Sequence, residues 1–312
     1  MSMKMQRGIS IIEVMVTLAI AMVILLAVTR AYLSGFYTQQ AQVDVTRLNE
    51  SMRFAFDLVS KELRKAGYRN SWQLGSVSSN TFCSTPAAGT AISLLQGLND
   101  PATINPAAAS MAGTTWSISN RSDVLRVSYY GDVALATGGS APVLDCQGYP
   151  VVAGSMSADT LFVANDASNN NEPTLFCHTT NASNVGTTNP GTTNPMPLVA
   201  GVESMQLLYG EDTDGDGIIN RYVPWQLLTN SDNVLSVKLS VVVRSPNGVA
   251  VTSAQPTFNH FSSGPAGSLL YAYPSVTNGD PGAIFTPVAA DRRIRQMLST
   301  EIAVRNYRWC GA

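Results

Sequence analysis

The residues with the clearest chemistry lie in a short acidic stretch, residues 212–220. Its aspartates follow the D-x-D-x-D-G spacing with which an EF-hand loop begins. Carboxylates at the first, third and fifth positions converge on one hard cation, because such a loop coils around the ion. The spacing therefore predicts a calcium site with these oxygen ligands: Asp212, Asp214, Asp216, the Ile218 carbonyl and Asn220.

The stretch departs from an EF-hand at its twelfth position. Val223 stands where the bidentate glutamate belongs, and strand patterns rather than helical ones flank the loop. We therefore expect an EF-like loop within a β-hairpin, with Glu211 either as a substitute ligand or as a source of negative field. A polar β-turn without a metal is the alternative, because Asp and Gly are common in turns.

A further carboxylate, Glu13, lies within an apolar segment, where a charged group is energetically unfavourable. Glu13 is the one charged residue of an apolar run at residues 9–28, which follows a short leader ending at Gly8. At about 1.5 Å per helical residue, this run crosses about 30 Å, the hydrocarbon thickness of a bilayer. An acidic residue at the centre of such a span costs about 2.5–3.5 kcal/mol, so Glu13 indicates a function or a partner.

The leader, residues 1–8, predicts the orientation of this span. It carries Lys4 and Arg7, and positive residues stay on the cytoplasmic side. The rest of the chain is then expected beyond the membrane. A secretory signal is cut after its apolar segment, next to small residues, and no convincing site of that kind follows residue 28. We therefore expect the mature protein to keep the span.

Catalytic chemistry finds little support. His178 and His260 form no H-E-x-x-H pair and are expected to be polar loop residues. The sequence contains no G-x-S-x-G elbow, phosphate-binding loop or dinucleotide fingerprint. The basic cluster at residues 292–295 is expected to be a solvated strand face or a contact with a neighbouring subunit. A net charge of −2 gives no case for nucleic-acid binding. We predict a non-enzymatic protein.

Four cysteines follow the span: Cys83, Cys146, Cys177 and Cys310. An even number in an oxidising compartment predicts two disulfides, and the spacings match no compact zinc motif. Four cysteines allow three pairings, and the sequence does not choose among them. We favour Cys146 with Cys177, and Cys83 with Cys310.

These groups need a scaffold, and the first part of it is a long helix at residues 9–67, with its membrane span at residues 9–28. Residues 39–66 contain no Pro or Gly, and apolar residues recur there at spacings of three and four. That spacing is one face of an α-helix, and the charged residues mostly take the other face. Gly67 supplies a stop.

The chain beyond the helix follows strand patterns. Short alternating or apolar runs bounded by turn residues occur at residues 124–130, 160–163, 174–177, 202–209, 234–243 and 299–306. Residues 70–122 and 181–197 are expected to be loops. The predicted fold class is α+β, with the long helix packed on an antiparallel β-sheet domain at residues 68–312. A composition with 45% hydrophobic and 13% charged residues suits such an exported, β-rich protein.

The leader also carries a family resemblance. The run Gly8-Ile9-Ser10-Ile11-Ile12-Glu13 resembles the type III signal of type IV pilins and pseudopilins. The resemblance implies that a prepilin peptidase cuts after Gly8 and methylates the new N-terminus, Ile9, where the family usually has Phe. It also implies that Glu13 neutralises the terminal amine of a neighbouring subunit in the filament. A buried carboxylate becomes tolerable when a cation is supplied next to it.

Other segments are similar to the PilW class of minor pilins and to the related GspJ-type minor pseudopilins: residues 54–68, the acidic turn followed by Arg221 and Tyr222, and residues 291–295. This resemblance implies a minor pilin that helps to prime type IV pilus assembly within a complex at the pilus tip. Twitching motility, adhesion and DNA uptake follow at the level of the fibre. The implied location is the bacterial inner membrane, single-pass with a periplasmic domain, and then the pilus tip at the cell surface.

The resemblance also implies binding partners, and two alternative functions stay open. The partners are other minor pilins, the major pilin, the prepilin peptidase, the inner-membrane assembly platform and a tip adhesin. One rival is a GspJ-like minor pseudopilin of a type II secretion system, which the sequence hardly separates from a pilin. The other is a membrane-anchored, calcium-binding surface enzyme whose leader resembles that of a pilin by chance.

Overall fold

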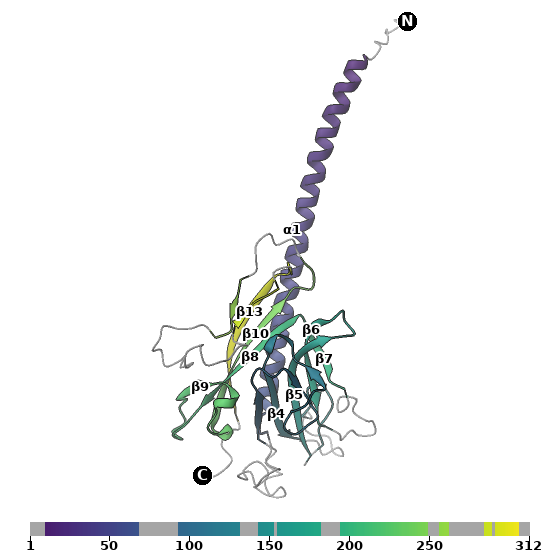
Figure 1. Ribbon diagram of the computed structural model, residues 1–312. Coiled ribbons are helices and arrows are strands. Elements are labelled where there is room, and N and C mark those ends of the chain that lie inside the picture. Colours follow the sequence, from purple (N-terminus) through teal and green to yellow (C-terminus); the bar gives the residue numbers. More distant parts are fainter. Residues whose placement is uncertain are drawn as a thin grey trace.

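The computed structural model describes residues 10–68, 93–131, 143–152, 155–181, 194–248, 256–261, 284–288 and 291–305. Figure 1 shows a single long helix, α1, whose first half projects away from a β-rich body and whose second half runs along that body. The architecture is the predicted α+β class: one N-terminal helix packed on antiparallel sheets.

Helix α1 (Ile11–Lys65) is 55 residues long. It ends just before Gly67, which adopts a left-handed φ of 67° that a residue with a Cβ rarely takes. The Gly67 N–H donates to the Ser128 carbonyl at 2.9 Å, so the end of the helix is fastened to a strand. The predicted stop at Gly67 is confirmed.

The second half of α1 enters the core through the predicted apolar stripe. Leu48, Met52, Val59 and Leu63 are all buried. Full burial of an aliphatic side chain stabilises the fold by about 1.5–3 kcal/mol, so these residues hold the helix on the body. Val45, which the spacing placed in the same stripe, is 38% exposed, and the buried part of the stripe therefore begins at Leu48.

Two antiparallel sheets form most of the body. The five-stranded sheet has the order β1-β4-β5-β6-β7 and consists of Leu95–Leu98, Val124–Tyr130, Met156–Asp166, Glu172–Thr179 and Met196–Ala200. The four-stranded sheet has the order β13-β10-β8-β9 and consists of Arg295–Ala303, Val234–Arg244, Val202–Glu211 and Arg221–Val223.

Two short hairpins and three 3₁₀ turns complete the described elements. The hairpins are β2 (Thr103–Ile104) with β3 (Trp116–Ser117), and β11 (Phe258–Asn259) with β12 (Ile284–Phe285). The 3₁₀ turns are Ser119–Arg121, Trp225–Leu227 and Ser231–Asn233.

One hydrophobic core joins α1 to both sheets. Alternate residues of the longer strands face it, as the period of a strand requires; on β10 these are Val237, Leu239, Val241 and Val243. A smaller cluster lies on the opposite face of the five-stranded sheet, where the β2–β3 hairpin covers Phe162, Phe176 and their neighbours. The five-stranded sheet is therefore buried on both faces, which explains its near-continuous apolar runs.

The structure corrects two details of the strand predictions. The last strand spans Arg295–Ala303 rather than residues 299–306, so it begins within the basic cluster. The region expected to be a loop at residues 70–122 contributes β1 to the five-stranded sheet. A strand of four residues carries too little periodicity to be recognised from sequence. Most of the other expected loop, residues 181–197, lies outside the described residues.

Candidate functional site

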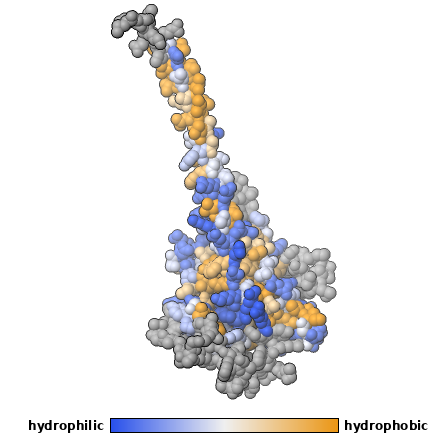
Figure 2. Space-filling view, turned by 180° about the vertical axis from the view of Figure 1, so that it is seen from behind, coloured by the Kyte–Doolittle hydropathy of each residue, from blue (hydrophilic) through white to orange (hydrophobic). Residues whose placement is uncertain are grey.

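The first candidate site is the exposed half of α1. Its large apolar side chains face solvent; Ile11 is 81% exposed and Met22 is 71% exposed. In the part of the chain that the structure describes, α1 is the one helix long and apolar enough to cross a membrane. Figure 2 shows this half as a nearly continuous hydrophobic surface, which contrasts with the polar stretch below it. Such a surface requires a lipid or protein environment.

Glu13 lies on this exposed half, in the first turn of α1. The four leading N–H groups of a helix lack internal partners, so a carboxylate is favoured at this end by the helix dipole. Gly8 and Ile9 lie outside the described residues. In the sequence, the predicted cleavage creates the new terminal amine four residues before Glu13.

The second candidate site is the acidic loop between β8 and β9. Carboxylate oxygens of Asp212, Asp214 and Asp216 lie within 4.8 Å of one another. Asp212 is buried and accepts hydrogen bonds from the Gly215 and Gly217 N–H groups at 2.6 and 2.8 Å. Gly217 has a φ of 86°, the sharp turn that the sequence motif predicts. The loop thus brings together the three aspartates that the sequence proposed.

The other two proposed ligand residues, Ile218 and Asn220, make hydrogen bonds within the loop. The Ile218 N–H donates to Asp216 Oδ1 at 2.7 Å, and the Ile218 side chain is 66% exposed. Asn220 Oδ1 accepts hydrogen bonds from the N–H and the hydroxyl of Thr213 at 2.6 and 3.0 Å. Asn220 therefore ties the two ends of the loop together.

Glu211 does not act as the substitute ligand that the sequence suggested. Its Oε2 pairs with Arg221 at 2.8 Å, and its Oε1 accepts hydrogen bonds from the N–H groups of Thr229 and Asn230 at 2.7 and 2.9 Å. Burial by itself raises the pKa of Glu211, but these hydrogen bonds and the Arg221 charge outweigh it and lower the pKa. Val223, at the twelfth position, is buried.

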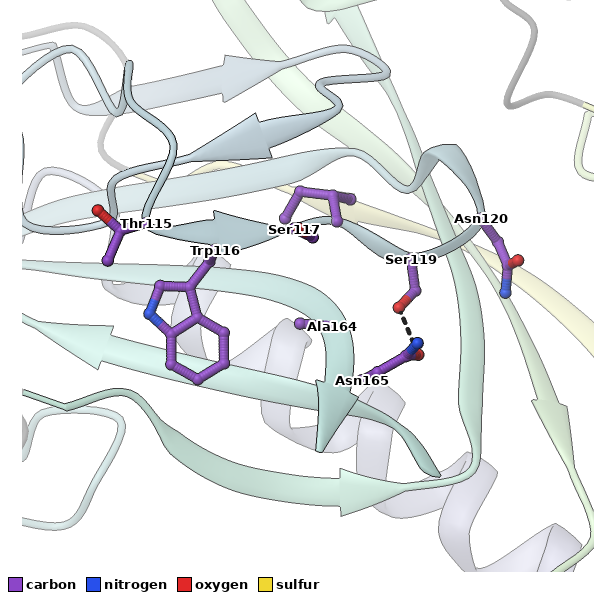
Figure 3. Close-up of a pocket in the computed structure, with 8 residues that line it drawn as sticks. Thr115, Trp116, Ser117, Ser119, Asn120, Ala164 and Asn165 are labelled. Atoms are coloured by element: carbon purple, nitrogen blue, oxygen red, sulfur yellow. Dashed lines mark hydrogen bonds between the residues drawn. The ribbon is translucent and has the colours of Figure 1, made fainter. Parts of the chain in front are cut away.

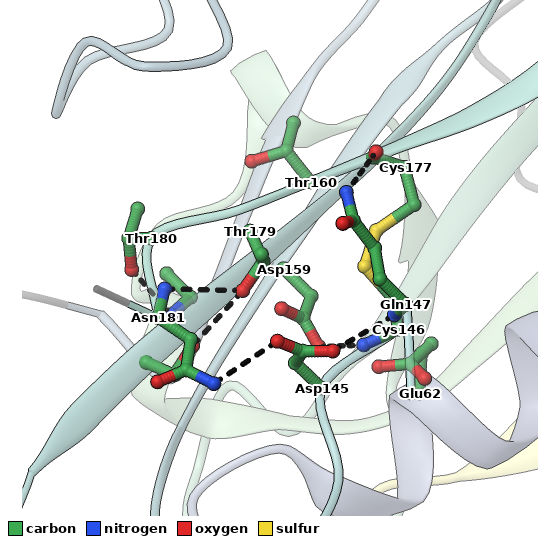
Figure 4. The surroundings of a disulfide bond; sticks show 12 residues. Glu62, Asp145, Cys146, Gln147, Asp159, Thr160, Cys177, Thr179, Thr180 and Asn181 are labelled. Atoms are coloured by element: carbon green, nitrogen blue, oxygen red, sulfur yellow. Dashed lines mark hydrogen bonds between the residues drawn. A yellow bond between two sulfur atoms is a disulfide. The ribbon is translucent and has the colours of Figure 1, made fainter. Parts of the chain in front are cut away.

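The disulfide joins Cys146 to Cys177 on β6, which is the pairing we favoured. Cys83 and Cys310 lie outside the described residues. Figure 4 shows that the disulfide lies beside a cluster of acidic and amide side chains. The centre of this cluster is Asp159 Oδ2, which accepts hydrogen bonds from the Cys146 N–H at 2.9 Å and from the Tyr129 hydroxyl at 2.6 Å.

Helix α1 contributes two charges to the same cluster. Lys65 Nζ lies 2.6 Å from Glu62 Oε2 and 3.2 Å from Asp159 Oδ2. Burial raises the pKa of Glu62 to about 8; the Lys65 charge opposes this shift and the Asp159 charge adds to it. This cluster was not predicted from the sequence. Glu62 follows Val59 by three residues, which places it beside the buried stripe, and that spacing was the available signal.

The basic cluster at residues 292–295 is not a solvated face throughout. Arg292 is exposed, but the Arg295 side chain is 1% exposed and pairs with Glu203 and Asp291. Arg293 and Arg244 both pair with Glu172, and Arg244 also reaches Glu203 and Asp291. This network, which we call the arginine network, links β6 of one sheet to β8, β10 and β13 of the other. It joins the two sheets where they meet.

Both histidines are buried, contrary to the expectation of polar loop residues. His178 lies on β6, and His260 lies between Ser204 and Ser240, at 2.9 and 3.0 Å from their hydroxyl oxygens. Burial lowers the pKa of His260 to about 4, so the ring is neutral at pH 7. A serine beside a histidine suggests a nucleophile, but both groups are buried and a substrate has no access to them.

Comparisons with known proteins match two separate parts of the chain. Residues 160–306 match the family described as type IV pilus-assembly protein W, and residues 3–29 match the prokaryotic N-terminal methylation motif. No curated protein matches the sequence. Among solved structures, a type IV-like pilin from Thermus thermophilus aligns with 84% of this chain and 97% of its own, at 13% identity and a TM-score of 0.40.

Proposed function

Because this chain is a type IV pilin-like protein of the PilW class, we propose that it is a minor pilin that helps to prime pilus assembly within the complex at the pilus tip. The observation that supports this role is the division of α1 into two halves. The first half exposes apolar side chains along its length, and the second half is the central element of the folded body. A subunit built in this way is stored in a membrane and then transferred into a bundle of similar helices.

In the proposed mechanism, prepilin peptidase removes residues 1–8 and leaves a charged amine on Ile9. The apolar half of α1 holds the subunit in the inner membrane, with the β-rich body in the periplasm. Glu13 then attracts the terminal amine of a neighbouring subunit, since a carboxylate in an apolar medium gains most from a nearby cation. The body selects its partners, which include other minor pilins, the major pilin and a tip adhesin.

We also propose that the acidic loop binds calcium. Three carboxylates within 4.8 Å of one another fit a hard divalent cation, and they repel one another without it. Asp212, Asp214 and Asp216 would hold the ion. Because Val223 offers no carboxylate and Glu211 is committed to Arg221, the ligand set contains fewer protein oxygens than that of an EF-hand, and water completes it. The ion would stiffen the β8–β9 loop.

The first experiment is to measure the intact mass and N-terminal sequence of the protein from its native membrane, in cells with and without prepilin peptidase. We expect a mature chain that begins at Ile9 and carries one added methyl group, and we expect processing to be lost without the peptidase. Retention of residues 1–8 in both strains would rule out a pilin and favour the membrane-anchored enzyme.

A second experiment tests the role in assembly. We expect deletion of the gene to reduce surface pili sharply, wild-type protein to restore them, and Glu13→Ala to fail despite normal cleavage. Glu13→Asp keeps the charge and serves as the matched control, for which we expect partial rescue. If pili are normal in the deletion strain but type II secretion fails, the protein is a GspJ-like pseudopilin instead.

A further inference from the structure

A polar cavity of about 510 Å³ lies beside the β2–β3 hairpin, on the face of the five-stranded sheet opposite the main core. Its lining includes Trp116, Ser119, Asn120 and Asn165. Figure 3 shows the indole of Trp116 at one end of the lining and the Ser119–Asn165 pair at the other. The cavity therefore combines one large aromatic side chain with hydroxyl and amide groups. Nothing in the proposed pilin role uses it.

Trp116 is held rigidly at one end of the cavity. Its ring packs against Phe162 with an interplanar angle of 67° and against Phe176 at a centroid distance of 5.1 Å. Both phenylalanines are buried, so they fix the indole from below. Among the described residues, none accepts a hydrogen bond from the indole N–H. Trp116 thus offers an apolar ring and an available donor.

Two asparagines provide oriented polar groups. The Ser119 hydroxyl donates to Asn165 Oδ1 at 2.8 Å, and Asn120 Nδ2 donates to the Glu203 carbonyl at 2.9 Å. These bonds fix both amides and leave Asn165 Nδ2 as a donor and Asn120 Oδ1 as an acceptor, neither with a partner in the described part of the chain. A donor and an acceptor that line the same cavity suit hydroxyl groups of one ligand.

The rim of the cavity also carries an unusual backbone. Asn120 and Arg121 are consecutive left-handed residues, with φ of 49° and 53°. Non-glycine residues seldom adopt this conformation, and two in succession persist only where the surroundings impose it. Here Gln206 Nε2 donates to the Arg121 carbonyl at 2.7 Å, and Arg121 pairs with Asp100 at 3.1 Å. The fold therefore maintains this strained turn, which places the Asn120 side chain at the cavity.

The charged residues beside the cavity give no preference for an ionic ligand. A second cavity of about 200 Å³ shares Asn120 and Asn165 with the first and extends to the arginine network. That network consists of three arginines and three carboxylates, all engaged with one another: Arg244, Arg293 and Arg295 with Glu172, Glu203 and Asp291. Each guanidinium of this network is paired with a carboxylate, so the network itself favours neither an anion nor a cation.

We propose that the two cavities, which share Asn120 and Asn165, form one groove that binds a neutral oligosaccharide. One sugar ring would lie against Trp116, whose flat apolar face suits the C–H groups of a pyranose. The hydroxyl groups of that ring would reach Asn165 and Asn120. The hydroxyl and amide groups of the lining disfavour an apolar ligand. The paired charges of the arginine network give no attraction for phosphates or acidic sugars. The binding requires only the folded body and is independent of the proposed assembly role.

The test uses the full chain labelled with 5-fluorotryptophan, in a detergent without a sugar headgroup. ¹⁹F NMR resolves the individual tryptophans, and Trp116→Phe and Trp225→Phe assign two of the resonances. The probes are maltose, lactose and N,N′-diacetylchitobiose at millimolar concentrations. We expect at least one probe to shift the Trp116 resonance saturably. The Trp225 resonance serves as an internal control, since Trp225 packs on Tyr209 outside the cavity. Absence of a Trp116 shift with all three probes overturns the proposal.

A pair of variants gives a second, independent test. Asn165→Ala removes an exposed side chain and is expected to weaken sugar binding by about three- to tenfold, the value of one hydrogen bond. Asn169→Ala changes an exposed residue of the same β5–β6 hairpin outside the cavity and is expected to bind normally. Equal affinities for the two variants would also overturn the proposal. Filament assembly in cells is a separate measurement, so failure of one hypothesis leaves the other testable.

Discussion

At the scale of single residues, the least expected feature is the charged cluster beneath the disulfide. Two carboxylates and one ammonium group are buried together, where the cost of desolvation is large. Asp159 Oδ2 accepts hydrogen bonds from the Tyr129 hydroxyl and the Cys146 N–H. The negative charge of Glu62 is stabilised less, because Glu62 shares Lys65 with Asp159. The proton that the cluster needs at neutral pH is therefore carried by Glu62.

The pKa of Glu62 predicts a pH-dependent stability. Its pKa rises from 4.5 to about 8 on folding, so the folded state binds the proton more tightly. This contribution is fully present below pH 4.5 and is lost as the pH rises through about 8. Glu62→Gln mimics the protonated group, and we expect it to reduce the fall in melting temperature between pH 5 and pH 8. Glu50→Gln, at an exposed position on the same helix, is the control. Identical pH profiles for wild type and Glu62→Gln would contradict this assignment.

The acidic loop gives a second prediction at this scale. If it binds calcium, a calcium concentration of about a hundred times Kd stabilises the protein by about 2.7 kcal/mol. We expect Asp214→Asn with Asp216→Asn to abolish the calcium-induced rise in melting temperature. Both side chains are exposed, so the fold without calcium should be unaffected. Asp57→Asn, exposed on α1, should keep the response. A wild-type melting temperature that does not change with calcium would leave the loop as a polar turn.

At the scale of elements, α1 has two environments along one continuous helix. The side chains of its first half are exposed among the described residues, and its second half contributes Leu48, Met52, Val59 and Leu63 to the core. The helix does not stop at the boundary because both halves have helix-forming residues and the backbone satisfies its own hydrogen bonds. The same element can therefore anchor the subunit and carry the fold of the body.

A substitution on each face of the second half tests this division. Leu63 is fully buried, and Leu63→Ala should destabilise the body by about 2–5 kcal/mol, since it leaves a cavity. Phe54 lies on the uncovered face and is 55% exposed, so Phe54→Ala should change stability by about 0.5 kcal/mol or less. Urea unfolding followed by circular dichroism measures both. A large loss of stability in Phe54→Ala would mean that this face is covered.

At the scale of the whole molecule, the arginine network joins two sheets that share one core. It brings together residues from β6, β8 and β10 and the chain that leads into β13. The core alone is non-directional, so it fixes burial more strongly than it fixes the relative position of the sheets. Ion pairs with defined geometry at the junction add that specificity.

Loss of one arginine should show how much the junction contributes. Arg295→Met keeps the length of the side chain but leaves Glu203 with Arg244 alone, and we expect a loss of up to about 3–5 kcal/mol of unfolding free energy. Arg292→Met changes an exposed neighbour and should have little effect. Equal stability of the two variants would show that the network is incidental.

Features that depend on local pattern were predictable from the amino-acid sequence. The apolar run, the helical spacing, the stop at Gly67 and the strongest strands follow from propensity and period, and the structure has them. The family resemblance came from contiguous motifs such as Gly8 to Glu13. The spacing of Asp212, Asp214 and Asp216 was also local, and so the loop brings them together as expected.

The burial of particular polar residues, and the partners that they meet, depend on how the helix and the sheets pack together. Glu62 meets Asp159, and Arg295 meets Glu203, across about a hundred residues of sequence, 97 and 92 respectively. Trp116 and Asn165 likewise come from different strands. No local pattern encodes such pairs, because a charged or polar residue has the same sequence signature on a solvated face as in a satisfied network. The packing of α1 and the two sheets removes these groups from water, and that step gives each of them its partner.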